Sequence, residues 1–407
     1  MRCLKHCRRL TLFLLTLALV FRLWQAPTQP VTATNSIHGV WMTNLGAALM
    51  YYSTRLDEVV ANLAQHQINT LYPAVWNRGY SLHSSRVSHA AGGRRRDWLT
   101  DIPLLPGDRI LSELIAQGHR QGLRLIPWFE YGLMIPASNA IAQAHPDWLT
   151  TDITGATVRQ PLTPEPGLPP ALQNVQLEIT GGNLAWLNPL HPEVQNFLVE
   201  LIAEVVERYP VEGIQLDDHF GLPVELGYDD YTRQRYATEH GGASPPTNPR
   251  DPAWMAWRSR QLTTLMARIH QRVKAINPDA IISLSPNPPD FAYREYLQDW
   301  RSWVDQGLVD EVIVQLYRPD LTALKRDLAN PDLNRIKQQL PIAIGLYTGP
   351  FWPVKPLDRL RTEIQTVQAA GYQGVSFFCW ETTLWMLRHE PAEQVQQQFQ
   401  TLLAGDS

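Results

Sequence analysis

Two adjacent carboxylates directly follow a short apolar stretch in this chain. Asp217 ends a strand that the pattern predicts from Gly213 to Asp217, and Asp218 comes next. In sheets and barrels of parallel strands, catalytic groups collect at the carboxyl ends of the strands. Capping of a helix N-terminus explains one such aspartate but leaves the second without a role. We therefore interpret the pair as part of a reaction centre.

Other predicted strands also end in acids. Glu130 follows the third strand and Glu381 follows the eighth. Carboxylates that share one cleft raise each other's pKa values, so a protonated acid can stand beside an ionised base or nucleophile near neutral pH. Glycoside hydrolysis requires that division of roles. The predicted catalytic residues are Asp217, Asp218, Glu130 and Glu381.

The same strand ends carry groups that suit a sugar. Aromatic faces stack on sugar rings, and amide, imidazole and guanidinium groups bond to hydroxyl groups. The predicted substrate-binding residues are Asn44, Trp76, Arg78, Trp128, Tyr131, His219, Asn287, Gln315, Tyr317, Tyr347 and Trp380.

Several of these residues have a purely structural alternative. Glu130 could form an ion pair with Arg78 or Arg318, and Glu381 could cap the last helix at its first turn. His219 could be a loop histidine whose hydrogen bonds are satisfied by its neighbours. The sequence leaves these alternatives open.

Eight short apolar runs, separated by helical patterns, provide the elements that would position the site. The runs span Ile37–Thr43, Asn69–Val75, Leu123–Phe129, Gly213–Asp217, Ala280–Ser285, Glu311–Leu316, Ile342–Tyr347 and Gly374–Trp380. Amphipathic helices are predicted at Leu56–His66, Ile110–Gln121, Val194–Tyr209, Trp254–Ile276 and Leu357–Ala370. This alternation predicts one α/β domain, a closed (β/α)₈ TIM barrel, rather than a doubly wound sheet.

Three of the predicted strand-to-helix connections are long. They follow strands 2, 3 and 4 and span 81–108, 133–187 and 221–250; the second contains the proline-rich stretch Gln160–Pro170. Long loops in a compact domain commonly form lids or binding walls. Because all three leave the same face of the barrel, we expect them to enclose a cleft above Asp217 and Asp218.

The N-terminus resembles a targeting segment. Arg2, Lys5, Arg8 and Arg9 precede an apolar run, Leu10–Phe21, that is shorter than a usual membrane span. We expect residues 1–33 to be a signal peptide or an N-terminal membrane anchor, and residues 34–407 to be the barrel domain. The protein is then exported to the periplasm, the cell envelope or the medium, with membrane attachment only through this segment.

Composition and motifs exclude several other classes. A net charge of −4 gives no basic surface for nucleic acid. The histidines lack the spacing of metal ligands, and no phosphate loop is present. We expect no metal, no cofactor and no nucleic-acid partner; the expected partner is a polysaccharide or oligosaccharide.

Several segments, in order, resemble glycosyl-hydrolase-like family 10. They are His38–Asn44, Tyr72–Tyr80, Pro127–Gly132, Trp186–Val194 and Gly213–Phe220. The resemblance implies a TIM-barrel glycoside hydrolase that is exported in bacteria, with some relatives acting on the glycan strands of peptidoglycan. It also implies that Asp217, Asp218 and Glu130 are site residues.

The Gln215–Asp217 segment is also similar to the fourth strand of α-amylase-type barrels, in which the final aspartate is the nucleophile. This chain departs from that pattern because its fifth strand does not end in glutamate. The acid would then be Glu130, Asp218 or Glu381.

The sequence thus predicts an exported glycoside hydrolase for a polysaccharide, with bacterial cell-wall glycan of the peptidoglycan type as the leading substrate. Asp217 would be the nucleophile or base, and Glu130 or Asp218 the general acid. One alternative is a carbohydrate-binding barrel without catalysis; another is a barrel lyase or hydrolase with a non-sugar substrate.

Overall fold

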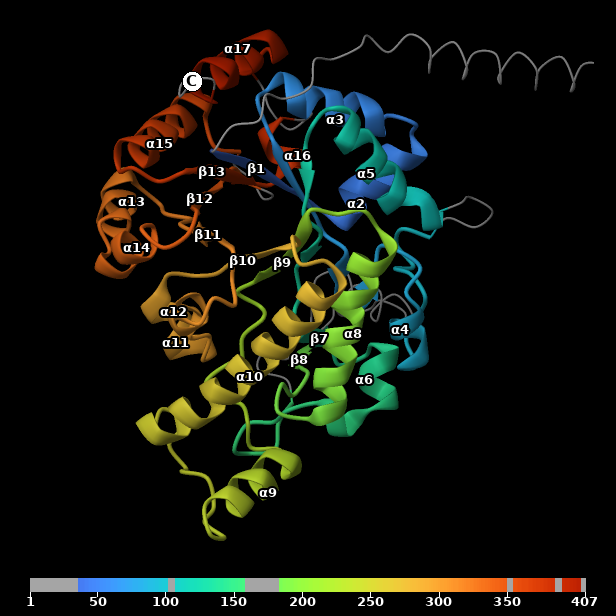
Figure 1. The fold of residues 1–407 in the computed structure, drawn as a ribbon, viewed down its shortest axis with the longest axis vertical. Coiled ribbons are helices and arrows are strands. Elements are labelled where there is room, and N and C mark those ends of the chain that lie inside the picture. The colour runs from blue at the N-terminus through green and yellow to red at the C-terminus, as the bar shows by residue number, and fades with distance from the viewer. Residues whose placement is uncertain (1–35, 102–106, 158–182, 350–353, 385–389, 404–407) are drawn as a thin grey trace, which may run out of the picture.

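The computed structural model describes residues 36–101, 107–157, 183–349, 354–384 and 390–403, and it shows parallel strands surrounded by helices (Figure 1). The expected leader, residues 1–33, and the proline-rich stretch lie outside the described residues. The strands of the main sheet are β1 (Ile37–Met42), β2 (Thr70–Pro73), β5 (Arg124–Leu125), β6 (Trp128–Phe129), β9 (Gly213–Asp217), β10 (Ile281–Ser285), β11 (Glu311–Gln315), β12 (Ile342–Tyr347) and β13 (Gly374–Phe378). They match the eight predicted runs.

The sheet closes into a barrel because the third run pairs on both sides. The strand order is β5-β2-β1-β13-β12-β11-β10-β9-β6, and β5 and β6 are two parts of the same run. Pro127, which has no N–H to donate, stands between the two parts. β5 pairs with β2 and β6 pairs with β9, all in parallel register. The predicted (β/α)₈ barrel is therefore confirmed.

The outer layer consists of helices whose apolar faces pack on the strands. The five predicted helices are found as α3 (Leu56–Gln65), α5 (Ile110–Arg120), α8 (Pro192–Arg208), α10 (Pro252–Ile276) and α15 (Leu357–Ala369). The layer is completed by α12 (Trp300–Asp305), α13 (Leu321–Leu328), α14 (Pro331–Ile336) and α17 (Ala392–Leu403). At the chain end, α17 bonds to both neighbours: the amide of Gln398 donates to Leu357 O and that of Gln400 to Gln65 O.

The barrel interior is filled by large side chains. Trp41, Tyr72, Trp128 and Ile313 belong to one buried cluster inside the ring. Gly39 leaves room for the Tyr72 ring, because a Cβ at this position would lie 2.7 Å from it. The interior is thus a packed core, and any cleft must lie above it, at the carboxyl ends of the strands.

The three long connections carry small elements of their own. The first contains β3 (Trp76–Asn77), β4 (Tyr80–Ser81), α4 (Arg86–Ala90) and η1 (Gly107–Arg109). The second contains β7 (Met134–Pro136), α6 (Ala140–Ala144), η2 (Pro146–Trp148) and β8 (Leu184–Trp186), and the third contains α9 (Asp230–Glu239). Shorter helices, α2 (Asn44–Tyr52), α11 (Pro289–Tyr296) and α16 (Trp380–Thr383), follow strands β1, β10 and β13. Across the described ranges, no helix is both long enough and apolar enough to span a bilayer.

Candidate active site

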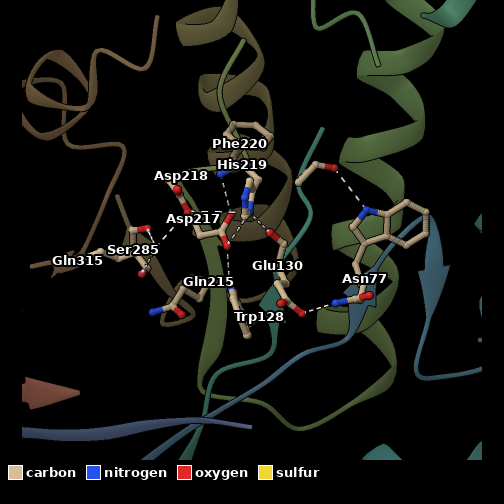
Figure 2. A network of polar contacts seen from close by, with 12 residues as sticks. Asn77, Trp128, Glu130, Gln215, Asp217, Asp218, His219, Phe220, Ser285 and Gln315 are labelled. Carbon is tan, nitrogen blue, oxygen red and sulfur yellow. Dashed lines mark hydrogen bonds and ion pairs between the residues drawn. The ribbon is translucent and has the colours of Figure 1, made fainter. Parts of the chain in front are cut away.

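The Asp217 carboxylate is buried at the end of β9, and its side chain is only 1% exposed. Its Oδ2 accepts a hydrogen bond from Trp128 Nε1 at 3.0 Å, and its Oδ1 accepts one from the His219 backbone N–H at 2.9 Å. The amide of Gln298 donates to Asp217 O and so fixes the turn after the strand. Figure 2 shows the carboxylate held between Trp128 and His219.

The Asp218 carboxylate is more accessible, with 20% of its side chain exposed. Its two oxygens accept hydrogen bonds from Asn287 Nδ2 at 2.9 Å and Gln315 Nε2 at 3.0 Å. These amides come from the ends of the fifth and sixth strands. The Asp218 carboxyl group is thus both oriented by two amide donors and partly exposed to solvent.

Glu130 joins the aspartates from the neighbouring strand. The register of β6 on β9 pairs Phe129 with Leu216, so the next residues, Glu130 and Asp217, follow side by side. The amide of Asn77 donates a short hydrogen bond to Glu130 Oε2 (Figure 2). Burial raises the pKa of Glu130 to about 7, and the nearby Asp217 charge adds to the increase. Glu130 therefore keeps a proton close to neutral pH.

The pKa of Asp217 is also raised, to about 6, chiefly by burial. The charge and hydrogen bonds of His219 oppose this increase. The two groups therefore have similar pKa values, and that of Glu130 is the higher. Between these values Glu130 is mostly protonated and Asp217 mostly ionised, which is the division of roles that an acid–base site needs.

His219 links the three acids. Its Nδ1 lies 2.8 Å from Glu130 O, 3.5 Å from Asp217 Oδ2 and 3.9 Å from Asp218 Oδ1. Burial lowers the pKa of His219, but the charges of Asp218 and Asp217 outweigh it and raise the pKa well above its usual value. A protonated imidazole here balances part of the negative charge of the pair.

Asp217, Asp218 and His219 are also close enough together to be considered as metal ligands. Glu130 O can only accept, so His219 Nδ1 carries a proton; Nε2 is the ring nitrogen that could bind a metal, and only in the neutral ring. The Asp218 oxygens already face amide N–H groups.

Glu381 occupies a different place from the other predicted acids. Its Oε1 accepts hydrogen bonds from the Thr43 N–H at 3.0 Å and the Thr43 hydroxyl at 2.6 Å, so it supports the N-terminus of α2. Within the described residues, no hydrogen bond or ion pair joins it to Asp217, Asp218 or Glu130. The structure gives Glu381 a supporting position, although at a helix other than the one expected.

The predicted aromatic platforms divide into two groups. Trp76 and Trp380 are 1% and 2% exposed, so the structure does not place either ring face on the cleft surface. The buried Trp128 contributes its indole N–H to Asp217. Tyr131, Tyr317 and Tyr347 are partly exposed and remain the candidates for contact with sugar; the first two lie close enough to the acids to interact with their charges, and Tyr347 packs against Tyr317.

Asn44 and Arg78 lie beneath the protein surface. Both are buried, and both side chains donate to Asp97, at 2.6 Å and 2.8 Å. The proposed ion pairs of Glu130 with Arg78 or Arg318 are wrong, because these arginines pair with Asp97 and Asp327. The structure therefore does not show Asn44 and Arg78 as direct sugar contacts.

Two residues near the site were not among the predicted site residues. Asn77 contacts Glu130, and it follows the second predicted strand between Trp76 and Arg78, which were predicted. Asp97 follows Arg94, Arg95 and Arg96 in a long loop. No strand end or motif marks it, so its contact with the site emerges only from the path of the loop.

Comparison with known proteins gives one family. The model of the family glycosyl hydrolase-like 10 matches residues 36–355. Glycosyl hydrolase DigH of Escherichia coli strain K12 is 29% identical over 234 residues, which cover 53% of this chain and 47% of DigH. Glycosyl hydrolase YngK of Bacillus subtilis strain 168 is 24% identical over 236 residues, covering 52% of this chain and 39% of YngK. The match thus spans less than half the length of either relative.

Solved structures agree on the fold. The PgaB (BpsB) glycoside hydrolase domain from Bordetella bronchiseptica has a TM-score of 0.59 at 14% identity and covers 89% of this chain and 99% of its own. The catalytic domain of β-amylase from Paenibacillus polymyxa has a TM-score of 0.58 at 10% identity and covers 92% of this chain and 99% of its own. Given the family match over most of its length and the barrel that it forms, the chain belongs to the glycosyl hydrolase-like 10 family.

Proposed function

We propose that this protein is a glycoside hydrolase that cleaves a polysaccharide with Glu130 as general acid. One observation carries the proposal: a carboxyl group with a pKa of about 7 lies beside a buried aspartate with a pKa of about 6. A protonated acid next to an ionised carboxylate can protonate a leaving glycosidic oxygen while negative charge stabilises the developing oxocarbenium ion.

The two aspartates have different roles in this proposal. Both oxygens of the buried Asp217 accept N–H groups, so it stabilises positive charge and keeps His219 protonated. Asp218 presents the accessible carboxylate that acts as nucleophile or as the base for water. This proposal moves the role of nucleophile or base from Asp217, to which the sequence analysis assigned it, to Asp218, because Asp218 is the more exposed of the two carboxylates.

We further propose that the substrate is bacterial cell-wall glycan. The leader-like segment would bring the protein to the compartment that contains this polymer. The partly exposed Tyr131, Tyr317 and Tyr347 would stack on sugar rings, and Asn287 and Gln315 would hold Asp218 beneath them.

The test is an incubation of the purified full chain with peptidoglycan strands that carry stem peptides and with strands that lack them, followed by mass spectrometry of the products. Parallel reactions use Glu130→Gln, Asp217→Asn and Asp218→Asn variants whose circular dichroism matches the parent. We expect new reducing ends with the parent and strong loss in all three variants. Binding of glycan without any product over long incubation would instead identify a carbohydrate-binding barrel.

A further inference from the structure

A tight hairpin presents Asn77 to Glu130. β3 and β4 pair Trp76 with Ser81 and Asn77 with Tyr80, so only Arg78 and Gly79 form the turn. Both have positive φ, +52° and +76°, as two-residue hairpin turns of the mirror-image type require. Arg78 adopts a left-handed conformation that is unfavourable for a residue with a side chain, so surrounding contacts must hold it.

The Arg78 guanidinium contacts both Asn77 and Asp97. Its Nε donates to Asn77 Oδ1 at 2.6 Å, and its Nη2 donates to Asp97 Oδ2 at 2.8 Å. A guanidinium can only donate, so the Asn77 oxygen must face Arg78 and its NH₂ group must face Glu130. Arg78 thereby fixes which end of the Asn77 amide reaches the acid.

Asp97 anchors the other side of Arg78. Its side chain is fully buried and accepts hydrogen bonds from Asn44 Nδ2 at 2.6 Å and from the Leu99 N–H at 3.0 Å, in addition to Arg78. Removing one partner from a buried pair leaves an uncompensated charge, so the arrangement is rigid. The contacts run without interruption from Asp97 through Arg78 and Asn77 to Glu130.

We propose that Asp97, Arg78 and Asn77 form a positioning relay that holds the Glu130 carboxyl group in the orientation from which it donates its proton. The inference rests on the role proposed for Glu130. In this assignment Arg78 and Asn77 are positioning residues that act through Glu130, and the relay ties the first long connection to the chemistry of the site.

The relay predicts the direction in which the pKa of Glu130 changes when one of its members is lost. Burial and the Asp217 charge raise its pKa, while the Asn77 hydrogen bond, His219 and Arg78 lower it. The ionisable groups of Tyr131 and Tyr317 also lie close enough to feel its charge. Loss of the Asn77 donor therefore raises the pKa of Glu130 further, and loss of Arg78 acts in the same direction, because the charge disappears and the amide can turn over.

The experiment titrates the Glu130 carboxyl by ¹³C NMR in the full chain, with Glu130→Gln to assign the signal. We expect Asn77→Ala, Asn77→Asp and Arg78→Met each to raise the pKa by about one unit. With a cleavable glycan, the alkaline limb of the rate profile should move up by the same amount and kcat should fall about tenfold, with little change in KM. Asn77→Ala removes the donor without adding a charge, whereas Asn77→Asp keeps the shape of the side chain but adds a second carboxyl group beside Glu130, so charge repulsion contributes to its shift.

Asn188→Ala is the matched control. Asn188 is another buried asparagine, directly after the second connection, and its amide donates to a carboxylate of the third connection, Asp229 Oδ1, at 2.9 Å. The Asn188→Ala variant should have a lower melting temperature but the same Glu130 pKa as the parent. An unchanged or lowered pKa in the relay variants, or an equal shift in Asn188→Ala, would overturn the relay. Because the titration needs no turnover, absence of glycan cleavage by the parent would reject the proposed function alone.

Discussion

Three acids of the same chemical type acquire different properties at the end of β9 and β6. Asp217 is buried under Trp128 and His219, Asp218 is partly exposed and held by two amides, and Glu130 is partly buried and receives a hydrogen bond from Asn77. Desolvation opposes ionisation, and hydrogen bonds to the ionised form favour it. The environment, rather than the residue type, thus separates the acid from the base.

Glu130→Gln tests the role of the acid directly. Glutamine preserves the contact with Asn77 through its oxygen but has no proton to give, so we expect kcat to fall by about 10²–10⁴. The deficit should be smaller on an aryl glycoside, whose leaving group needs less protonation. The measurement is kcat on both substrates, with the melting temperature as a control for folding. Equal losses on the two substrates would argue that Glu130 is not the acid.

The sequence predicted part of this site and could not predict the rest. Asp217, Asp218 and Glu130 are adjacent to strands whose patterns are clear, so their convergence follows from the barrel. Trp76 sits at an equivalent strand end, yet its indole donates to Gly132 O and its ring packs in the core. Strand-end position therefore predicts nearness to the cleft, but the path of the next loop decides which way a side chain faces.

At the scale of the elements, the opposite end of the barrel is built for stability. Glu311 at the start of β11 accepts hydrogen bonds from Arg124 Nη1 and the Tyr72 hydroxyl, both at 3.0 Å. Arg124 also donates to Thr70 Oγ1 at 3.0 Å. This network joins three strands at their amino ends, away from the acids, where side chains of a barrel serve folding rather than catalysis.

Glu311→Gln should therefore destabilise the fold without changing the pH dependence of any activity. The Glu311 side chain is 3% exposed and Arg124 is 31% exposed, so we expect a loss of about 2–3 kcal/mol, below the cost for a fully buried pair. Urea unfolding measures the change. Glu200→Gln is the control, since Glu200 pairs with Arg272 at the surface and is 50% exposed. A cost no larger than that of the control would contradict the assignment.

The elements themselves could be predicted because their patterns are local. Each apolar run is short and bounded by turn residues, and each helix shows apolar spacing of three and four. The N-terminus of α10 is an example. Asp251 caps it by accepting a hydrogen bond from the Trp254 N–H at 3.0 Å, and Pro252 occupies its first turn. The break of the third strand at Pro127 could be anticipated from the missing N–H. The pairing of its two parts with β2 and β9, which closes the barrel, depends on residues far apart in the sequence and could not be read from a local pattern.

At the scale of the whole molecule, the long connections support one another above the barrel. Thr150 Oγ1, in the second connection, and Asn188 Nδ2, directly after it, both donate to Asp229 in the third. In the first connection, the Ser85 hydroxyl donates to the buried Glu204 of α8 at 2.6 Å. These hydrogen bonds join the described parts of the long connections to each other and to the helix layer of the barrel.

The N-terminal segment gives a prediction about the whole chain. We propose that residues 1–33 direct export, because basic residues precede a short apolar run. In a bacterial host, the full chain should be digested by protease added to spheroplasts while a cytoplasmic marker survives. Replacing Arg8 and Arg9 with glutamate should retain more of the chain in the cytoplasm. Equal protection of chain and marker would contradict export.

The most direct test of the account is the pH dependence of kcat/KM for glycan cleavage by the parent and by Glu130→Gln. Glu130 must be protonated and Asp217 ionised, so the rate should fall as pH rises through about 7 and also as pH falls through about 6. The maximum should lie between these values, and the alkaline limb should disappear in Glu130→Gln. A profile with no alkaline limb near 7, or one that Glu130→Gln retains, would contradict the shared acid–base site.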